Sequence, residues 1–251
     1  MNLGILFLHH GTNPVVLNNL LSIRRYNPHA TIVTISDNDP LPGGYSLSST
    51  PALEKLHARN KSRSSDWLVC SWFEQRKEQC DKWWICEWDT FCTISVEEFY
   101  RPVWEFPFVV SCVLRQDRDP RWYWFREVRK LPDGYRDFTI GASPFLYLVS
   151  NTALTDACEM LIREPILAAN GELRFATAAN RCGYAPCGYS PPCDHITWMP
   201  IGYLDAQQRS IWHPVKYNVD LLGSGTALPP TESSLDASGG GQQTDDVLRT
   251  R

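Results

Sequence analysis

The 251-residue sequence has no excess of positive charge, since 24 Lys and Arg stand against 28 Asp and Glu and the formal net charge at pH 7 is −4. Proteins that take duplex DNA or an anionic membrane surface as their main partner need such an excess to neutralise phosphates. We therefore expect no nucleic acid partner. A local basic pocket for a phosphate group is still compatible with this composition.

The first residues of this sequence do not predict a targeting segment. Met1 and Asn2 precede an apolar run of only five residues, Gly4–Leu8, with no basic segment before it and no small-residue cleavage site after it. The run is too short to span a bilayer. It predicts a buried first strand, and we expect no integral membrane segment.

The nine cysteines are odd in number, and several lie in apolar strings where a reduced thiol packs as a small hydrophobic group. Disulfides are rare in a reducing compartment, so we expect a cytoplasmic protein. Four potential zinc ligands fall within fourteen residues, in a spacing that matches no familiar zinc motif: Cys182, Cys187, Cys193 and His195. A structural zinc site and a group of reduced, loop-packed cysteines both fit this spacing.

With 43% apolar residues, the chain is able to bury one sizeable core. Its first segments predict a strand–helix–strand unit, because the apolar runs 4–8 and 31–35 flank apolar residues at helical spacing in 14–26. A right-handed crossover makes two such strands parallel. We therefore expect an α/β fold with a mostly parallel central sheet flanked by helices, and ligands at the strand ends.

The later segments extend this pattern. Residues 83–86 predict a central buried strand, residues 140–150 a turn followed by a strand, and residues 152–162 a helix. Residues 67–73 fit a strand or an amphipathic helix, because periodicity cannot decide for so short a run. The ten tryptophans serve either a large core or stacking against sugars and bases.

Residues 223–251 differ in composition from the rest of the chain. They contain five Gly, two Pro and no aromatic residue. Such a segment buries too little apolar surface to offset its chain entropy. We expect a single folded domain over 1–222 and a disordered tail over 223–251.

Two carboxylates follow the predicted strand 83–86. Glu87 and Asp89 are two residues apart, so in a continuing strand their side chains point to the same side while Trp88 turns away. Two hard oxygen ligands at a strand end suit Mg²⁺ or Mn²⁺ that also holds a diphosphate. A pair of solvated surface acids is the alternative interpretation.

The order of these segments resembles that of the GT-A class of nucleotide-sugar glycosyltransferases. A strand–helix–strand start is followed by Asp37 after the second strand, by the acidic motif 87–89 after a later strand, and by a late His213 with Lys216 nearby. The resemblance covers most of residues 1–217. It implies a Rossmann-like GT-A fold, a nucleoside-diphosphate sugar as donor, Mn²⁺ or Mg²⁺ as cofactor, and a glycan or other hydroxyl compound as acceptor.

The resemblance also implies a role for each matching residue. Asp89 and Glu87 match the two acids of the family's Asp-x-Asp motif and would hold the metal ion together with the imidazole of His213. Lys216 would place a positive charge against the leaving diphosphate, and Asp37 would accept hydrogen bonds from base or ribose. The Glu at position 87 departs from the commoner Asp, and its longer side chain is able to reach the ribose or a metal-bound water instead. A packed histidine at 213 and an Asx-turn at 37 are the structural alternatives.

Acceptor activation in an inverting transfer needs a carboxylate near the anomeric carbon, because a sugar hydroxyl is too weakly acidic to attack unaided. Glu172 is the candidate, with an ordinary acid at a helix N-terminus as the alternative.

Three further segments are candidates for binding donor or acceptor. They are a donor pocket at Asn60, Arg63, Asp66 and Trp67, a stacking wall for an acceptor glycan at 121–125, and a close backbone approach to the donor sugar at 141–144. A core stripe at 121–125 and a simple turn at 141–144 are the alternatives.

Two other functions are compatible with parts of the sequence. A non-catalytic glycan- or protein-binding module would use the Trp-rich surface for its partner and the cluster at 182–195 as a structural zinc site. A nucleotidyltransferase also uses paired carboxylates on an α/β sheet, but the sequence has no Gly-rich basic loop of the kind those enzymes place on a triphosphate. The sequence therefore predicts a metal-dependent glycosyltransferase, with the binding module as the alternative.

Overall fold

The computed structural model describes residues 2–37, 39–46, 65–164, 169–189, 195–197, 201–202, 204–205 and 207–219. Some expectations fall outside these residues: those for Asn60, Arg63 and Cys193, and the tail at 223–251. The boundary of the folded domain near residue 222 therefore stays a prediction.

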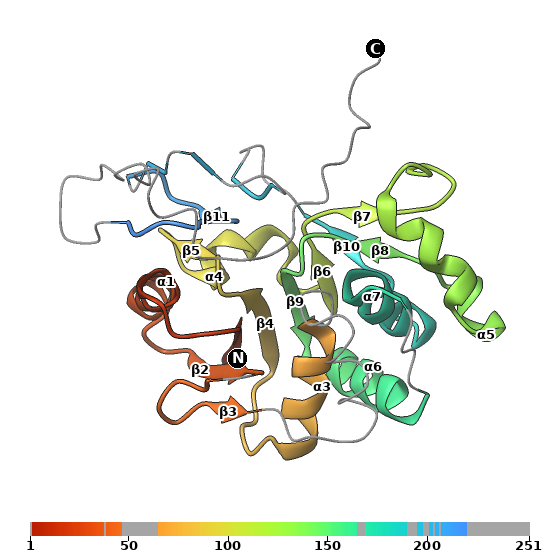
Figure 1. The fold of residues 1–251 in the computed structure, drawn as a ribbon, viewed down its shortest axis with the longest axis horizontal. Coiled ribbons are helices and arrows are strands. Elements are labelled where there is room, and N and C mark those ends of the chain that lie inside the picture. The colour runs from red at the N-terminus through yellow and green to blue at the C-terminus, as the bar shows by residue number, and fades with distance from the viewer. Residues whose placement is uncertain are drawn as a thin grey trace, which may run out of the picture.

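A seven-stranded sheet forms the centre of the molecule, with the strand order β10-β6-β9-β4-β1-β2-β3 (Figure 1). β1 (Leu3–His9) pairs in parallel with β2 (Thr31–Ser36) on one side and with β4 (Lys82–Glu87) on the other. Helix α1 (Pro14–Tyr26) connects β1 to β2. The predicted strand–helix–strand unit and the central strand at 83–86 are thus confirmed.

The other half of the sheet contains one antiparallel strand. β9 (Tyr147–Ser150) runs antiparallel to both β4 and β6 (Phe108–Val110), whereas β10 (Cys187–Gly188) is parallel to β6 and β3 (Tyr45–Ser46) is parallel to β2. Four of the six strand pairings in this sheet are therefore parallel. The predicted α/β class with a mostly parallel sheet is confirmed.

Two small antiparallel sheets and several short helices lie outside the main sheet. The small sheets pair β5 (Phe91–Cys92) with β11 (Ile211–Trp212) and β7 (Val113–Leu114) with β8 (Gly141–Ala142). The short helices are α4 (Val96–Phe99), η2 (Arg101–Val103), η3 (Tyr123–Lys130) and α5 (Asp133–Arg136). Several of these elements line the candidate site described below.

Helices cover both faces of the main sheet. Successive side chains of a strand point to opposite faces, so Ile5 and Phe7 of β1 pack with α1 while Leu6 and Leu8 pack on the other face. A strand covered on both faces has a continuous apolar sequence. This is why the run at 4–8 is apolar throughout rather than alternating.

Three helices pack on the second face: α3 (Ser65–Gln75), α6 (Asn151–Arg163) and α7 (Gly171–Arg181) (Figure 1). The ambiguous segment 67–73 is therefore helical, and the predicted helix 152–162 is α6. Trp72, Trp83 and Trp84 are fully buried, which confirms the core interpretation for these three tryptophans. No described helix has both the length and the apolar character that crossing a membrane requires.

A buried ion pair joins α3 to α7. Arg174 donates from Nε and Nη2 to the two carboxylate oxygens of Asp66, at 2.8 and 2.6 Å. The two side chains are 1% and 0% exposed. This two-pronged geometry is the strong form of a charge-assisted hydrogen bond, and each charge depends on the other for compensation in the core.

Replacing Arg174 by Met is expected to lower the free energy of unfolding by about 3 kcal/mol, because Asp66 is left as an uncompensated buried charge. Urea unfolding of the variant measures this loss. The double variant Arg174→Met, Asp66→Leu is expected to recover most of it, since both charges are then absent. Equal urea midpoints for the single variant and the wild type would contradict the buried pair.

Candidate functional site

The acidic motif lies where the central parallel strands end. Glu87 is the last residue of β4 and is in register with Leu8, one residue before the end of β1. Asp37 directly follows β2. Because these strands are parallel, their carboxyl ends meet at one edge of the sheet. Asp89 lies in the turn that follows, which is closed by the N–H of Thr90 donating to the carbonyl of Glu87 at 3.1 Å.

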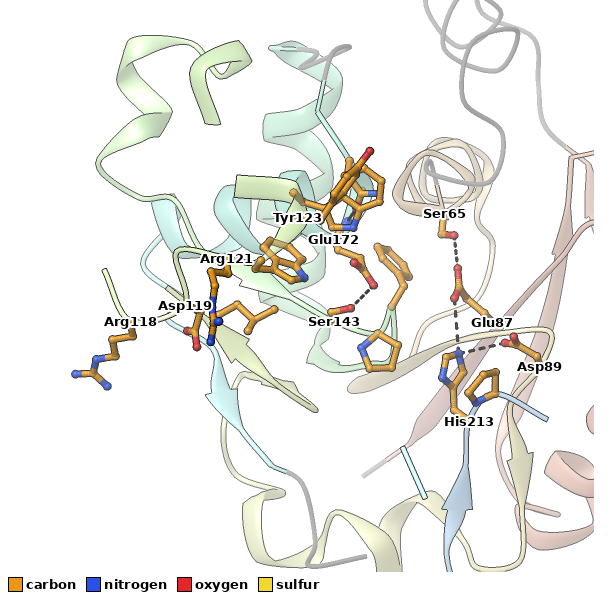
Figure 2. A pocket seen from close by; sticks show the side chains of 18 of the residues that line it. Ser65, Glu87, Asp89, Arg118, Asp119, Arg121, Tyr123, Ser143, Glu172 and His213 are labelled. Carbon is orange, nitrogen blue, oxygen red and sulfur yellow. Dashed lines mark hydrogen bonds and ion pairs between the residues drawn. The ribbon is translucent and has the colours of Figure 1, made fainter. Parts of the chain in front are cut away.

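His213 reaches the same edge through β11, which pairs with β5 just after the acidic motif. The N–H of Val215 donates to the carbonyl of Asp89 at 2.6 Å, which holds the two segments together. His213 Nε2 lies 3.2 Å from Asp89 Oδ1 and 3.8 Å from Glu87 Oε2 (Figure 2). The two acids and the distant histidine therefore meet in space.

The donor set of these three side chains fits a divalent cation. One ligand atom from each lies within 4.8 Å of the others. Asp89 Oδ1 and His213 Nε2 are buried, and neither makes a hydrogen bond of normal geometry to a described residue, although buried polar atoms nearly always do so. Carboxylate oxygens suit Mn²⁺ or Mg²⁺, and the imidazole nitrogen favours a transition metal such as Mn²⁺ over Mg²⁺. The separations of 3.2 and 3.8 Å are near the roughly 3 Å between adjacent ligands of a six-coordinate ion.

The ionisation of His213 is governed by its two acidic neighbours. Burial alone lowers the pKa of a histidine, but the carboxylates of Asp89 and Glu87 outweigh burial and raise the pKa of His213 to about 10. Without a cation, the ring therefore carries a proton at neutral pH and balances the two acids. A bound cation would take over this balance, since a ligating imidazole is neutral.

A cavity of about 920 Å³ opens beside these three side chains, a volume typical of ligand sites. Lys216 lines it, with Nζ 3.9 Å from Asp89 Oδ2 and 5.7 Å from the ring centroid of Trp88. Figure 2 shows Glu87 and His213 on one side of the cavity and Glu172 on the other. The cavity thus has a carboxylate–imidazole end and a second, separate carboxylate.

Glu172 lines the cavity from the first turn of α7, which Asn170 caps by accepting the N–H of Glu172 at 2.8 Å. The side chain is therefore both a helix N-terminal acid and a cavity residue. Ser143 Oγ donates to Glu172 Oε1 at 2.6 Å, and Trp124 also hydrogen-bonds to this carboxylate. The pKa of Glu172 is raised to about 7, mainly because the carboxyl group is buried. The hydrogen bond from Ser143 lowers the pKa, and the negative charge of Glu87 raises it further.

The raised pKa of Glu172 predicts that the metal-free protein loses stability as pH rises. The pKa is 4.5 in an unperturbed chain and about 7 in the folded protein, so between these values the folded state keeps a proton that the unfolded state has released. The contribution of Glu172 to stability therefore falls from pH 4.5 through pH 7, by up to about 3 kcal/mol. Glu172→Gln is expected to reduce the loss of stability between pH 5 and pH 8 in urea unfolding, and the part that remains comes from groups such as His213. An unchanged loss would show that Glu172 does not contribute to it.

Asp66 and Asp37 are not among the residues that line the cavity. Asp66 points into the core from α3, so a donor contacts its carboxylate only if the pair with Arg174 opens. The Asp37 side chain is 3% exposed and lies 3.0 Å from Nδ1 of His10. The structure therefore does not bring these two predicted residues together with the acidic motif and Glu172 in one cavity.

The aromatic segment 121–125 is divided between cavity and core. Arg121 and the three aromatic residues at 122–124 line the cavity, whereas Phe125 is buried. The division between cavity and core falls within the first turn of η3, which begins at Tyr123. Both interpretations of this segment thus apply to part of it.

The segment 141–144 is also divided. Gly141 lies in β8, and the space where a side chain would stand is filled by Trp122, since a Cβ would lie 2.2 Å from Trp122 Cζ3. The close approach at Gly141 is thus made to a side chain and not to a donor sugar. Ser143 and Pro144 line the cavity.

Ser65 is a cavity residue that the sequence did not single out. Its hydroxyl donates to Glu87 Oε1 at 2.6 Å from the first position of α3. Helical geometry sends the next two residues, Asp66 and Trp67, into the core instead. A serine at a helix start is the only signal in the sequence, and it is too common to identify a site.

The described members of the proposed zinc cluster do not meet. Cys182 Sγ contacts Met160 Sδ at 3.9 Å, Cys187 lies in β10, and His195 stacks on Trp212 with ring centroids 3.7 Å apart. Among the described residues, the group of metal-ligand side chains that comes together is Glu87, Asp89 and His213. The cysteines of the described ranges are all free thiols.

No family model matches the sequence, and no curated protein matches it either. Several solved structures have a similar course of the chain. One is the galactosyltransferase LgtC in complex with donor and acceptor sugar analogs. Its TM-score is 0.43 and its identity 11%, and the match covers 73% of this chain and 72% of that chain. The apo-form glycosyltransferase GlyE of Streptococcus pneumoniae has a TM-score of 0.40 and 11% identity, over 74% of this chain and 45% of that chain. Mouse xyloside xylosyltransferase 1 has a TM-score of 0.36 and 11% identity, over 73% and 81%. At these values the α/β class rests on the protein's own sheet, described above.

Proposed function

We propose that this protein is a metal-dependent glycosyltransferase that moves a sugar from a nucleoside-diphosphate donor to a hydroxyl acceptor. The observation that carries the proposal is the meeting of Glu87, Asp89 and His213 at the edge of a large cavity, from segments more than a hundred residues apart in the chain. Such a group at the carboxyl ends of parallel strands lies where α/β sheets bind nucleotides.

The donor end of the cavity is suited to a diphosphate leaving group. Glu87, Asp89 and His213 would hold a divalent ion, which would supply positive charge to the diphosphate oxygens. The ammonium of Lys216 adds a second positive charge at the same end of the cavity. Ser65 fixes the Glu87 carboxylate by its hydrogen bond to Oε1.

The acceptor end has its own carboxylate. In an inverting transfer, the bond between the anomeric carbon and the diphosphate oxygen breaks with its electron pair going to the diphosphate, and the acceptor oxygen forms the new bond. The acceptor proton goes to Glu172, whose orientation is set by Ser143 and Trp124. A base with a pKa of about 7 is largely ionised just above neutral pH, which suits this role.

The nucleoside is proposed to lie along the ends of β1 and β2. The His10 side chain is 36% exposed there, and its Nδ1 is paired with the Asp37 carboxylate. Asp37 is therefore proposed to act by orienting the His10 ring toward the nucleoside, or to contact the nucleoside directly after its pair with His10 opens. Arg63 is proposed for the same donor pocket on sequence grounds alone.

A panel of nucleotide sugars tests the proposal. With Mn²⁺ present, at least one donor is expected to raise the melting temperature and to be hydrolysed slowly in the absence of acceptor, because water takes the place of the acceptor hydroxyl. Excess EDTA is expected to abolish both effects and added Mn²⁺ to restore them. The proposal fails if no nucleotide sugar binds, or if hydrolysis is equally fast with EDTA.

A further inference from the structure

One wall of the cavity is built from aromatic rings. Trp122, Tyr123 and Trp124, called here the aromatic wall, line the cavity at the start of η3. Tyr123 is 46% exposed, which is unusual for a large ring in the described part of the chain. Apolar surface left open inside a cavity is typical of a ligand site.

The rings of the aromatic wall are held in place from behind. Trp122 fits against Gly141, and Phe125 meets the Trp122 ring edge-on with centroids 4.9 Å apart. The guanidinium carbon of Arg126 lies 3.3 Å from the centroid of the Tyr123 ring, a cation–π contact. Rings that are already ordered lose little side-chain entropy when a ligand stacks on them.

The aromatic wall adjoins the proposed base. Trp124 hydrogen-bonds to the Glu172 carboxylate. Figure 2 shows Tyr123 and Glu172 together, across the cavity from Glu87 and His213. A ring stacked on the wall therefore has its edge near Glu172, while the carboxylate–imidazole end is left to the diphosphate.

We infer that the aromatic wall binds a sugar ring of the acceptor, an inference that rests on the proposed function. A pyranose has an apolar C–H face that covers an aromatic ring and hydroxyl groups around its edge that need polar partners. Arg118, Asp119 and Arg121 line the cavity beside the wall and supply donors and acceptors for such hydroxyls. A lipid chain would leave these polar groups unpaired.

Disaccharide binding tests the inference without any donor. Cellobiose, lactose and maltose are titrated into the full-length protein and followed by tryptophan fluorescence and calorimetry. At least one is expected to bind, and Tyr123→Ala to weaken its affinity about tenfold. Tyr123→Phe keeps the ring and is expected to bind as the wild type does. Phe106→Ala is the matched control, because Phe106 is 48% exposed and does not line the cavity.

The inference is overturned if none of the three disaccharides binds, or if Tyr123→Ala binds them as tightly as the wild type. Tyr123-dependent binding of a serine-containing hexapeptide in place of a disaccharide also overturns it. Donor hydrolysis by the same preparation reports separately on the proposed function. Hydrolysis without disaccharide binding removes only the inference, whereas Tyr123-dependent disaccharide binding without donor binding supports a sugar site and contradicts glycosyl transfer.

Discussion

Asp89→Asn protein is expected to lose Mn²⁺-dependent donor hydrolysis by about 1,000-fold or more, because one of the two carboxylates that would hold the cation becomes a neutral amide of the same shape. Asp89 is the acid closest to His213, with Oδ1 3.2 Å from Nε2, and it is 6% exposed, so water cannot easily take its place. Calorimetry of Mn²⁺ with metal-free protein measures the binding step, and the hydrolysis rate measures the chemistry.

The matched control for this experiment is Asp133→Asn. The Asp133 side chain is 92% exposed and pairs only with its helix neighbour Arg136 among the described contacts. The control is expected to bind Mn²⁺ and hydrolyse donor at the wild-type rate. An Asp89→Asn protein that binds Mn²⁺ as tightly as the wild type would remove Asp89 from the proposed metal site.

Glu172→Gln is expected to lower the turnover of sugar transfer by about 10²- to 10⁴-fold, because the amide cannot accept the acceptor proton. In the wild type, the pKa of about 7 predicts that transfer accelerates as pH rises through 7, since the base works only when ionised. This rise is expected to be absent in the variant. Initial rates of transfer to a disaccharide between pH 5 and pH 9 measure both effects.

Glu164→Gln is the control for Glu172. The Glu164 side chain is 45% exposed and pairs with Arg181 away from the cavity. It is expected to keep the wild-type rate and the wild-type pH profile. Transfer by Glu172→Gln at more than a tenth of the wild-type rate would show that another group, or the donor itself, takes the proton.

The sheet was predictable from local sequence because both of its faces are covered. The apolar runs at 4–8, 31–35 and 83–86 are all central parallel strands in the structure. Burial on both faces demands apolar side chains at consecutive positions, so the pattern is visible without any knowledge of the partners. The helix at 67–73 was ambiguous for the same reason, since it too is buried on most sides.

The fates of Ser65 and Asp66 show where local sequence stops being informative. The two residues are adjacent, yet Ser65 contacts Glu87 in the cavity and Asp66 pairs with Arg174 in the core. The difference depends on how α3 is rotated about its axis where it packs against α7. Helix α7 begins more than a hundred residues later in the chain. No spacing rule within the segment contains that information.

By itself, the sequence determined the α/β sheet and placed two acids just after its buried central strand, because burial on both faces acts on neighbouring residues. The strand does not continue to Asp89, since β4 ends at Glu87 and Asp89 lies in the following turn. Only the tertiary structure decided which distant groups join them: β11 carries His213 to Asp89, and α7 carries Glu172 to the far side of the same cavity. It also assigned Asp66 to the core and the three rings at 122–124, at the start of η3, to the cavity wall. These outcomes depend on contacts between segments far apart in the chain, whose loop-closure and packing energies leave no local pattern.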